Sequence, residues 1–384
     1  MLPDLGLYKN REQSFIKHTF LTQYLKAAAF KTLQGYSPIF NFVDAFAGPW
    51  KVQDEAKYSD ASFDQAITTL EAVRDTLEVQ GVRGLKIKFC FCEARPEAVA
   101  ELRKYAERIT GPEIHIFEGR FEENLEAISS KIPDGFTFTF IDPTGWNIQN
   151  DEVFAFLKKH RSEFMLNFMT DHINRHAEFE GVAASFGRFL ANPDWADEFK
   201  TLPTGLSNER KMLFLLKKSM KQAEIAAYLP DFSIMVPTKD RVKMRLLFGT
   251  HSSKGLEVFR DVQGKVELQE MEIRRELKSD GSPSLSSSLD YAAMEQHQKG
   301  VGCKAYRLEA KELILKFLAR RSSSKAEPLI NFLMERLPIR RTQLNTLLSE
   351  MRSEKKISFE LPARKRVPQK DTMIVANDSL TSKR

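Results

Sequence analysis

Acidic and small side chains follow several short apolar runs of this sequence, where each run ends. The residues after the first run, 40–43, include Asp44, Phe46, Ala47, Gly48 and Trp50. Small residues let backbone amides approach a ligand, and an acid can contact a cationic or hydroxylated group. The turn lacks a full glycine-rich fingerprint, and its lysine is not in a phosphate-loop context, so a phosphate cradle is not expected. It predicts either a ligand-binding loop or an ordinary strand-to-helix turn.

The next two runs also end in polar groups. The run "KIKFCFCE" ends in Glu93, which can accept hydrogen bonds from two ribose hydroxyls or, alternatively, cap the following helix. The third run leads into "EGRFEEN", where Glu118, Gly119 and Phe121 are expected to lie beside the adenine position of nucleotide-binding sheets. A solvated helix start is the alternative for this stretch.

The fourth run, "FTFTFIDPTGWN", carries the clearest chemical signal. Asp142, Pro143, Gly145 and Trp146 combine an acid, a stiff turn, a flexible position and an aromatic ring. Methylation of an amino group needs an acceptor for the nitrogen's hydrogens and a surface that holds its ring. The stretch therefore predicts a catalytic loop, with a rigid turn around a buried tryptophan as the alternative.

Other reactive groups do not form a recognisable site. His172 and His176 are four apart, but no third ligand follows at metal-binding spacing, so we expect no metal. Cys90, Cys92 and Cys303 are too few for a disulfide framework. The first two alternate along one expected strand and share a buried face, which predicts reduced core thiols.

The elements that must position these residues alternate between strands and helices. Apolar runs without strict alternation predict strands buried on both faces at 40–43, 87–92, 114–117, 136–141 and 164–168. An amphipathic helix over 10–33 precedes them, a helical insertion at about 171–230 follows, and a hairpin over 232–250 ends the series. This order predicts a doubly wound, Rossmann-like α/β sheet of the class I methyltransferase type.

The charge is unevenly distributed along the 384 residues. The net charge is +6, but the last 80 residues carry 18 Lys/Arg against 9 Asp/Glu. Three short helical patterns and two β-runs around a basic turn predict a C-terminal winged helix-turn-helix domain that binds a polyanion, with nucleic acid as the first candidate. The expected contacts are Arg340, Arg341, Arg352, Lys355, Lys356, Arg364, Lys365 and Arg366.

The expected domains are a Rossmann-like domain over 1–278, a small polar linker over 279–304 and the winged helix over 305–384. No apolar stretch reaches the length of a membrane span, and the first residues lack the layout of a signal peptide. We therefore expect a cytoplasmic protein without a membrane partner.

Four stretches together resemble a known family. "YKNREQSFIKHTFLTQYL", "FNFVDAFAGPW", "FIDPTGW" and "LLFGTHSSKGLEVFRDVQ" resemble the bacterial three-Cys-motif partner proteins over roughly residues 8–263. The resemblance implies an S-adenosylmethionine-dependent methyltransferase core and, as partner, a radical-SAM-like protein that carries the three cysteines. The C-terminal unit resembles a winged helix that some members append.

The resemblance also assigns residues. Lys17 and His18 match a helix that lines the cofactor pocket, and Asp44, Phe46, Ala47 and Gly48 match the cofactor loop. Glu93 matches the ribose acid, and Asp142, Pro143 and Gly145 match the loop facing the transferred methyl group. Trp50 departs from the family's "FAGPG", so that its ring either stacks on adenine or a substrate base, or fills the pocket.

Two functions follow as hypotheses. The first is a methyltransferase that acts on nucleic acid, or on a substrate associated with it, and is delivered by the basic winged helix. The second is a non-catalytic DNA-binding regulator, or an accessory partner of the radical-SAM-like protein, with a degenerate cofactor pocket. Asp142 and Glu93 favour the first, and Trp50 favours the second.

Overall fold

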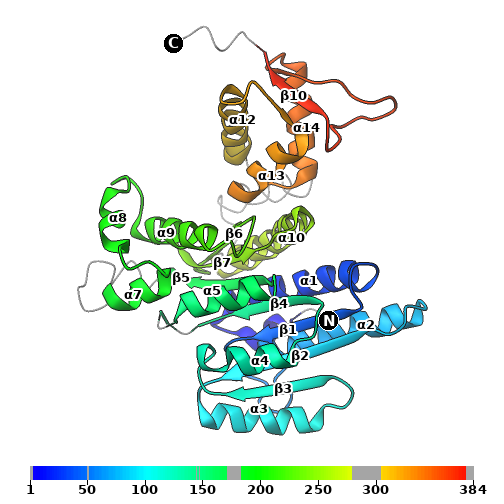
Figure 1. Cartoon of the computed structure of the whole chain (residues 1–384), viewed down its shortest axis with the longest axis vertical. Helices are drawn as coiled ribbons and strands as arrows, with labels where there is room; N and C mark the ends of the chain where they lie inside the picture. The colour runs from blue at the N-terminus through cyan, green and yellow to red at the C-terminus, as the bar shows by residue number, and fades with distance from the viewer. Residues whose placement is uncertain are drawn as a thin grey trace. The chain divides into compact units, whose positions relative to one another are not determined.

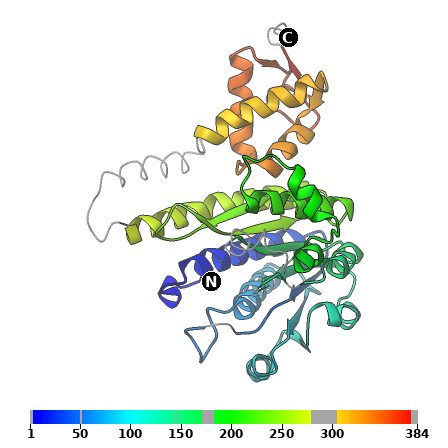
Figure 2. The same cartoon turned by 90° about the vertical axis from the view of Figure 1, so that its left-hand side faces the viewer.

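The computed structural model describes residues 3–49, 52–143, 145–146, 148–170, 183–278 and 304–377. The chain divides into two compact units, residues 1–252 and 253–384 (Figures 1 and 2). Several residues singled out in the sequence lie outside the described ranges, namely Trp50, His172, His176, Cys303 and all but the last residue of the expected linker 279–304.

The first unit is built on a seven-stranded sheet with the order β3-β2-β1-β4-β5-β7-β6. The strands are β1 (Ile39–Asp44), β2 (Lys86–Glu93), β3 (Glu113–Glu118), β4 (Phe136–Ile141), β5 (Glu163–Met169), β6 (Asp231–Met235) and β7 (Val242–Gly249). The first five strands are parallel, and β7 runs antiparallel to both β5 and β6. The predicted parallel sheet with a terminal hairpin is confirmed, and its strand order and directions are those of a doubly wound, Rossmann-like sheet.

Helices cover both faces of the sheet, which explains why its inner strands carry apolar residues on both faces. On one face, Tyr24 of α1 (Glu12–Leu33) contacts Phe138 of β4, and Phe63 of α2 (Ser62–Val79) contacts Phe91 of β2. Most side chains in the middle of α1 are buried, so this helix is more enclosed than the expected amphipathic helix. It packs against α2, β1 and β6 as well as the short helix η1 (Leu5–Tyr8).

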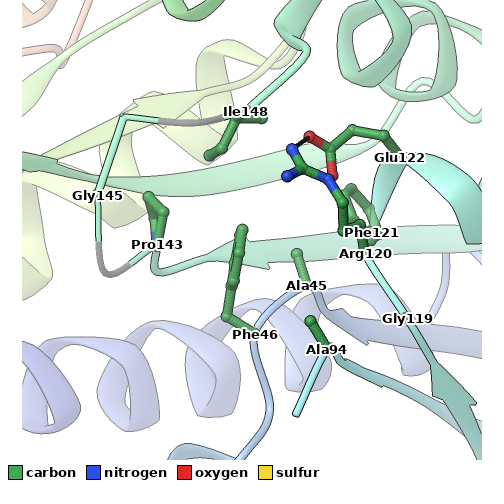
Figure 3. Close-up of a pocket in the computed structure, with 10 residues that line it drawn as sticks. All are labelled: Ala45, Phe46, Ala94, Gly119, Arg120, Phe121, Glu122, Pro143, Gly145 and Ile148. Atoms are coloured by element: carbon green, nitrogen blue, oxygen red, sulfur yellow. Dashed lines mark hydrogen bonds and ion pairs between the residues drawn. The ribbon is translucent and has the colours of Figure 1, made fainter. Parts of the chain in front are cut away.

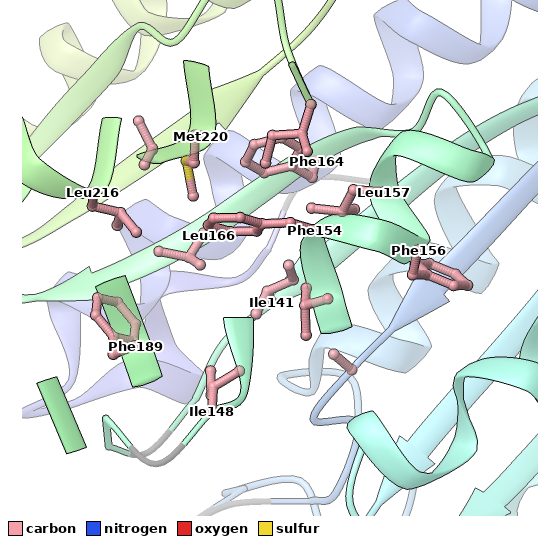
Figure 4. Packing of buried hydrophobic residues seen from close by; sticks show 14 of the residues in the cluster. Ile141, Ile148, Phe154, Phe156, Leu157, Phe164, Leu166, Phe189, Leu216 and Met220 are labelled. Atoms are coloured by element: carbon pink, nitrogen blue, oxygen red, sulfur yellow. The ribbon is translucent and has the colours of Figure 1, made fainter. Parts of the chain in front are cut away.

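The opposite face carries one large apolar cluster (Figure 4). Ile141 and Leu166 point into it from β4 and β5, together with side chains of α4 (Leu125–Lys131) and α5 (Asn150–Lys159). The described part of the predicted helical insertion contributes α7 (Ala183–Leu190), α8 (Trp195–Thr201) and α9 (Asn208–Gln222). Cys90 and Cys92 lie in the same cluster as buried free thiols, as predicted.

The outer edge of the sheet is completed by α3 (Pro96–Arg108), which packs on β3 and β2. Pro96 stands in its first turn, where a missing backbone N–H costs nothing. A 3-10 turn, η2 (Glu122–Asn124), joins β3 to α4. These connections place the loops after β1, β2, β3 and β4 at one edge of the sheet.

The second unit contains α10 (Ser253–Lys278), α12 (Lys304–Ala319), α13 (Ala326–Arg336) and α14 (Arg341–Ser353). A small antiparallel sheet in the order β8-β10-β9 accompanies them, with β8 (Ser323–Lys325), β9 (Ile357–Ser358) and β10 (Met373–Ala376). The three predicted helices and the two strands of the ribbon are present. The sequence analysis missed β8, a three-residue strand that is too short to show an alternating pattern.

Helix α10 is joined to α13 of the same unit by the buried guanidinium of Arg260. Arg260 is 2% exposed, and its Nε and Nη2 donate to the carbonyl oxygens of Met334 and Glu335, at 2.6 and 3.2 Å. These carbonyls end α13, whose last turn has no further helical donors. Among the described residues, no helix is long and apolar enough to cross a membrane.

Candidate functional site

A cavity of about 200 Å³ lies where the loops after β1, β2, β3 and β4 meet (Figure 3). It is lined by Ala45, Phe46, Ala94, Gly119, Arg120, Phe121, Glu122, Pro143, Gly145 and Ile148. Ligands of doubly wound sheets bind at this edge, beyond the carboxyl ends of the strands. Five residues predicted from the sequence therefore come together here, from three different loops: Phe46, Gly119, Phe121, Pro143 and Gly145.

The walls of the cavity suit a flat apolar ring. Phe46, Pro143 and Ile148 supply apolar surface, as Figure 3 shows. Gly119 has a φ of +114°, a conformation that side chains rarely adopt, and its N–H donates to the carbonyl oxygen of Glu93 at 3.0 Å. Phe121 is buried beneath the loop, edge-on to Phe156. The cavity is smaller than pockets for whole drug-sized ligands, roughly 300–1,000 Å³, so it fits one part of a larger molecule.

The loop after β1 is fastened to its neighbours by its own backbone. The N–H of Ala45 donates to the carbonyl of Phe140, and the N–H of Ala47 donates to that of Cys92, both at 2.9 Å. The N–H of Phe46 donates to Oδ1 of Asp44 at 3.0 Å. Since these three amides are used within the protein, they cannot cradle a phosphate, in agreement with the sequence analysis.

Gly48 allows this loop to approach the end of β2. A Cβ at this position would overlap the carboxylate of Glu93 and lie 2.7 Å from Nη2 of Arg95. Oε1 of Glu93 accepts hydrogen bonds from the backbone N–H and the Nε of Arg95, at 2.9 and 3.0 Å. Nη2 of Arg95 donates to Oε2 at 3.4 Å, so Arg95 contacts both carboxylate oxygens of Glu93, the residue predicted to bind a ribose.

Asp44 is completely buried at the end of β1. Its Oδ2 accepts a hydrogen bond from the Ser62 hydroxyl at 2.8 Å. Burial raises the pKa of Asp44 to about 7, and the negative charge of Asp142 acts in the same direction. The hydrogen bonds from Ser62 and Phe46 oppose this rise. Asp44 therefore titrates near neutral pH.

Asp142 is held as an anion at the end of β4. Its Oδ2 forms an ion pair with Lys17 of α1, and its Oδ1 accepts a hydrogen bond from Nδ2 of Asn167 at 2.6 Å. Burial alone would raise the pKa of Asp142, but Lys17 and Asn167 lower it below its ordinary value. The Asp142 side chain remains 21% exposed, so a ligand at the sheet edge can reach it.

His18, predicted beside Lys17 in the cofactor pocket, lies in a closed polar cluster instead. Its Nδ1 is 2.9 Å from the hydroxyl of Tyr8, which also accepts a hydrogen bond from Gln65 at 2.6 Å. Burial, with the neighbouring Lys17, lowers the pKa of His18 to about 3, so the ring is neutral. This arrangement gives His18 a structural role in fixing α1 against α2.

Trp146, predicted to stack on a substrate base, packs into the apolar cluster. Its ring lies edge-on to Phe168 and Phe189 and tilted to Phe186, with centroids 4.4–5.8 Å apart. Its indole N–H is buried without a hydrogen-bond partner among the described residues. The geometry thus favours the alternative that the sequence left open, a turn anchored by a packed tryptophan.

The predicted nucleic-acid contacts at the start of α14 are occupied within the second unit. Arg341 forms ion pairs with Glu257 of α10 and with Glu327 of α13, the latter at 2.7 Å. Arg340 lies against α10, where a Cβ on Gly264 would be 3.3 Å from its Cδ. The charge of Arg341 is therefore balanced by two acids before any ligand arrives.

The predicted nucleic-acid contacts in and near the β9–β10 loop are more accessible to a ligand. Arg364, Lys365 and Arg366 are exposed, and none of them pairs with an acid among the described residues. Arg352 lies over the Phe359 ring at 4.9 Å, and the side chain of Lys356 pairs with Glu354 at 2.8 Å. Lys355 is exposed as well. The loop 364–366 is thus the most available basic segment of the predicted set.

Sequence reasoning missed several residues of the site, and one of them carried a signal. Asn167 is an amide within the apolar strand "EFMLNFM", and it lies next to Asp142 because β4 and β5 are paired. A polar residue near the end of an inner strand marks the ligand edge of such a sheet. Arg95, Arg120 and Glu122 gave no comparable signal, since charged residues are ordinary in loops.

Comparisons with known proteins add limited information. No protein-family model matches this sequence, and no curated protein matches it either. Similar solved structures include a DUF519-family protein from Legionella pneumophila, with 13% identity, a TM-score of 0.36, and coverage of 66% of this chain and 89% of that one.

Two further solved structures are also similar to this chain. The cyclopropane synthase MmaA2 from Mycobacterium tuberculosis has 9% identity and a TM-score of 0.29, covering 71% of this chain and 78% of that one. Loganic acid methyltransferase with SAH has 8% identity and a TM-score of 0.31, covering 68% and 83%. Similarity this low supports no conclusion about function. We therefore assign the fold from the order and direction of the strands. The resemblance to three-Cys-motif partner proteins stays a prediction from the sequence.

Proposed function

We propose that this chain is an S-adenosylmethionine-dependent methyltransferase that acts on nucleic acid or on a substrate associated with it. The observation that carries the proposal is the meeting of Asp44, Glu93 and Asp142 at the carboxyl edge of β1, β2 and β4, beside one apolar cavity. An adenosine with a charged amino-acid end needs a ring slot, a ribose acceptor and charged partners, and this edge offers all three.

The residues present fit such a cofactor. The cavity beside Phe46, Pro143 and Ile148 would hold the adenine. Glu93 would accept the ribose hydroxyls at the lone pairs of its carboxylate that Arg95 does not use. When bound, the cofactor supplies an activated methyl group. The contribution of this chain would be orientation and the exclusion of water rather than covalent chemistry.

Asp142 is the residue we expect to orient the reacting groups. Its carboxylate is ionised, partly exposed and fixed by Lys17 and Asn167, so it can accept a hydrogen bond without first losing a proton. A fixed acceptor aligns a nitrogen for direct attack at the methyl carbon. Trp146 would support this loop from within the apolar cluster.

We further propose that the second unit is a winged helix that binds nucleic acid. Its helices and strands follow in the order α12, β8, α13, α14, β9, β10, with a long loop between the last two strands. In that plan the third helix approaches the major groove and the loop contacts the backbone. The exposed bases Arg364, Lys365 and Arg366 lie in that loop.

Calorimetric titration of S-adenosylmethionine into the full-length protein tests the enzymatic proposal. We expect saturable binding to the wild type and its loss in Asp44→Ala, because that change removes the acid to which the cofactor loop is bonded. The Trp50→Gly variant, titrated in parallel, shows whether the Trp50 ring stacks on the ligand or blocks its pocket. Weaker binding than in the wild type would indicate stacking, and stronger binding would indicate that the ring blocks the pocket. No binding to the wild type or to Trp50→Gly would refute the proposal.

A non-catalytic DNA-binding or accessory role is the second candidate, with a radical-SAM-like protein as the accessory partner. One observation favours it: the acids of the site already have partners in the protein, Arg95 for Glu93 and Lys17 for Asp142. Such a protein would bind DNA with or without the cofactor, and the titration above separates the two candidates.

A further inference from the structure

Asn167 presents a hydrogen-bond acceptor that the protein does not use. The residue is 3% exposed, and its Oδ1 is buried without a partner among the described residues. An unpaired buried acceptor costs stability, so its persistence calls for an explanation. A ligand atom that donates a hydrogen bond would provide one.

The orientation of this amide is fixed by its neighbours. Nδ2 of Asn167 donates to Oδ1 of Asp142 at 2.6 Å and lies 3.5 Å from Sδ of Met169. Turning the amide over would place its oxygen against the carboxylate of Asp142, which is repulsive. Oδ1 is therefore the atom left to accept.

The position of Asn167 points to the ligand edge. Phe164, Leu166 and Phe168 enter the apolar cluster, so Asn167, which alternates with them, projects to the opposite face, on the side of Lys17 and Asp142. Ile141 of β4 pairs with Leu166 of β5, which brings the next residues of both strands together.

Comparison with a second buried asparagine, Asn41, shows how the surroundings of Asn167 differ. Asn41 also has an unpaired Oδ1, but it lies in the first half of β1, and its amide donates to the Pro133 carbonyl and the Thr137 hydroxyl. Both of these hydrogen-bond partners are neutral. Asn167 instead adjoins a carboxylate that remains 21% exposed.

We infer that Asn167 is a ligand-contacting acceptor that works with Asp142 to bind a nitrogen carrying at least two hydrogens. This inference rests on the proposed function. One N–H would be accepted by Asp142 and the other by Oδ1 of Asn167. A hydroxyl brings one hydrogen and would leave one acceptor empty, so the pair selects an amine over an alcohol.

The proposed reaction offers two such nitrogens. One is the ammonium at the amino-acid end of the cofactor, whose carboxylate would then face Lys17. The other is the primary amino group of a nucleobase that receives the methyl group. The same pair of oxygens fits either one, and two titrations on the full-length protein distinguish them.

The first titration compares S-adenosylhomocysteine with 5′-methylthioadenosine, which lacks the amino-acid end. If the pair holds the cofactor, the wild type prefers S-adenosylhomocysteine, and Asn167→Leu reduces that preference roughly tenfold or more, the usual effect of one hydrogen bond to a charged group. Affinity for 5′-methylthioadenosine should stay within about twofold.

The second titration uses single-stranded oligonucleotides with S-adenosylhomocysteine present. One oligonucleotide carries adenine, and the other carries purine without the amino group. If the pair holds the substrate, the wild type prefers adenine, and Asn167→Leu removes that preference while the first titration is unchanged.

The controls separate this role from a structural one. Asn41→Leu removes a comparable buried amide far from Asp142 and should change neither preference. Asn167→Ser is a second variant for the case that Asn167→Leu unfolds. Its hydroxyl lies on a shorter side chain and no longer reaches the position of Oδ1, so we expect the same effect as in Asn167→Leu.

Each result has a distinct meaning. Unchanged preferences in both titrations, or no wild-type preference in either, would overturn the inference. If the wild type binds neither nucleoside, the proposed function fails first, and the role of Asn167 is decided by the oligonucleotides alone.

Discussion

The acids of the first unit and the bases of the second are placed in opposite ways. Asp44, Glu93 and Asp142 are buried or partly buried, and each is bonded to groups of its own unit. Arg364 and Lys365, in contrast, extend into solvent without an acidic partner among the described residues. Bonded acids define the shape and protonation of a small site, whereas exposed bases suit an extended polyanion.

Two arginines of the second unit resemble the acids of the first, because they too are bonded to groups of their own unit. Arg260 of α10 donates to a carbonyl oxygen at the end of α13. Arg341 of α14 forms ion pairs with Glu257 of α10 and Glu327 of α13. A basic residue in a basic domain is therefore not always a contact for nucleic acid. Burial and ion pairing decide which role it has.

The largest effect is expected at Arg260. Arg260→Ala would remove the hydrogen bonds that Arg260 donates to the carbonyls of Met334 and Glu335, which we expect to lower the free energy of unfolding of the second unit by roughly 2–4 kcal/mol. Urea unfolding followed by circular dichroism measures this. Arg320→Ala, an exposed arginine of the same unit, should change it by less than about 0.5 kcal/mol. Equal effects would contradict the assigned role.

Gly48→Ala tests the acid side of the comparison. The added methyl group must displace the Glu93 carboxylate. We expect affinity for S-adenosylhomocysteine to fall about 30-fold or more, as measured by calorimetry. Gly35→Ala is a matched control, because nothing lies within 4 Å of a Cβ there. Retained binding in Gly48→Ala would show that Glu93 is not a ligand contact.

The exposed bases are tested by changing Arg364, Lys365 and Arg366 to Ala together. Affinity for duplex DNA should fall roughly tenfold or more at low salt, and the dependence of log K on log salt should flatten by about one unit per lost phosphate contact. Fluorescence anisotropy measures both quantities.

A charge-matched control uses Lys316 in the last turn of α12 and Arg320 and Arg321 directly after it. Changing these three to Ala removes the same charge and should leave most of the affinity intact. If both triple variants lose the same affinity, binding depends on net charge and not on the loop.

The last test is the pH dependence of stability, whose effect is small over any single pH unit. The pKa of Asp44 is about 7 in the folded chain, against an ordinary value of 3.8. Between these values the folded state binds more protons than the unfolded state, so the free energy of unfolding falls as pH rises, by up to about 1.4 kcal/mol per pH unit. Asp44→Asn should flatten this slope in urea titrations between pH 4 and 8. Asp151→Asn, at an exposed acid, should not change it.

The sequence was sufficient to predict the fold of the first unit. Its strands are short apolar runs that end in an acid or a polar turn, and buried parallel strands require such runs. The five predicted strands agree with β1 to β5 to within one residue or two. The extent of α10 was not predicted, because its second half is polar and depends on tertiary contacts in the second unit.

The candidate site was predicted less completely. Positions at strand ends could be read directly, which is why Phe46, Gly119 and Pro143 line the cavity as expected. The partners of the charged groups could not be predicted, since Lys17 and Asp142 are far apart in the sequence. Trp146 was misplaced because an aromatic ring in a turn can point to solvent or to the core, and the choice depends on phenylalanines from a later helix.

The central claim is that the loops after β1, β3 and β4 enclose the adenosine of S-adenosylmethionine. Photolabelling the full-length protein with radioactive S-adenosylmethionine, followed by peptide mapping, tests it directly. The account predicts label on peptides that contain Phe46 or Phe121, and its loss when excess S-adenosylhomocysteine is added. Label elsewhere in the chain, or labelling that excess S-adenosylhomocysteine does not suppress, would contradict it.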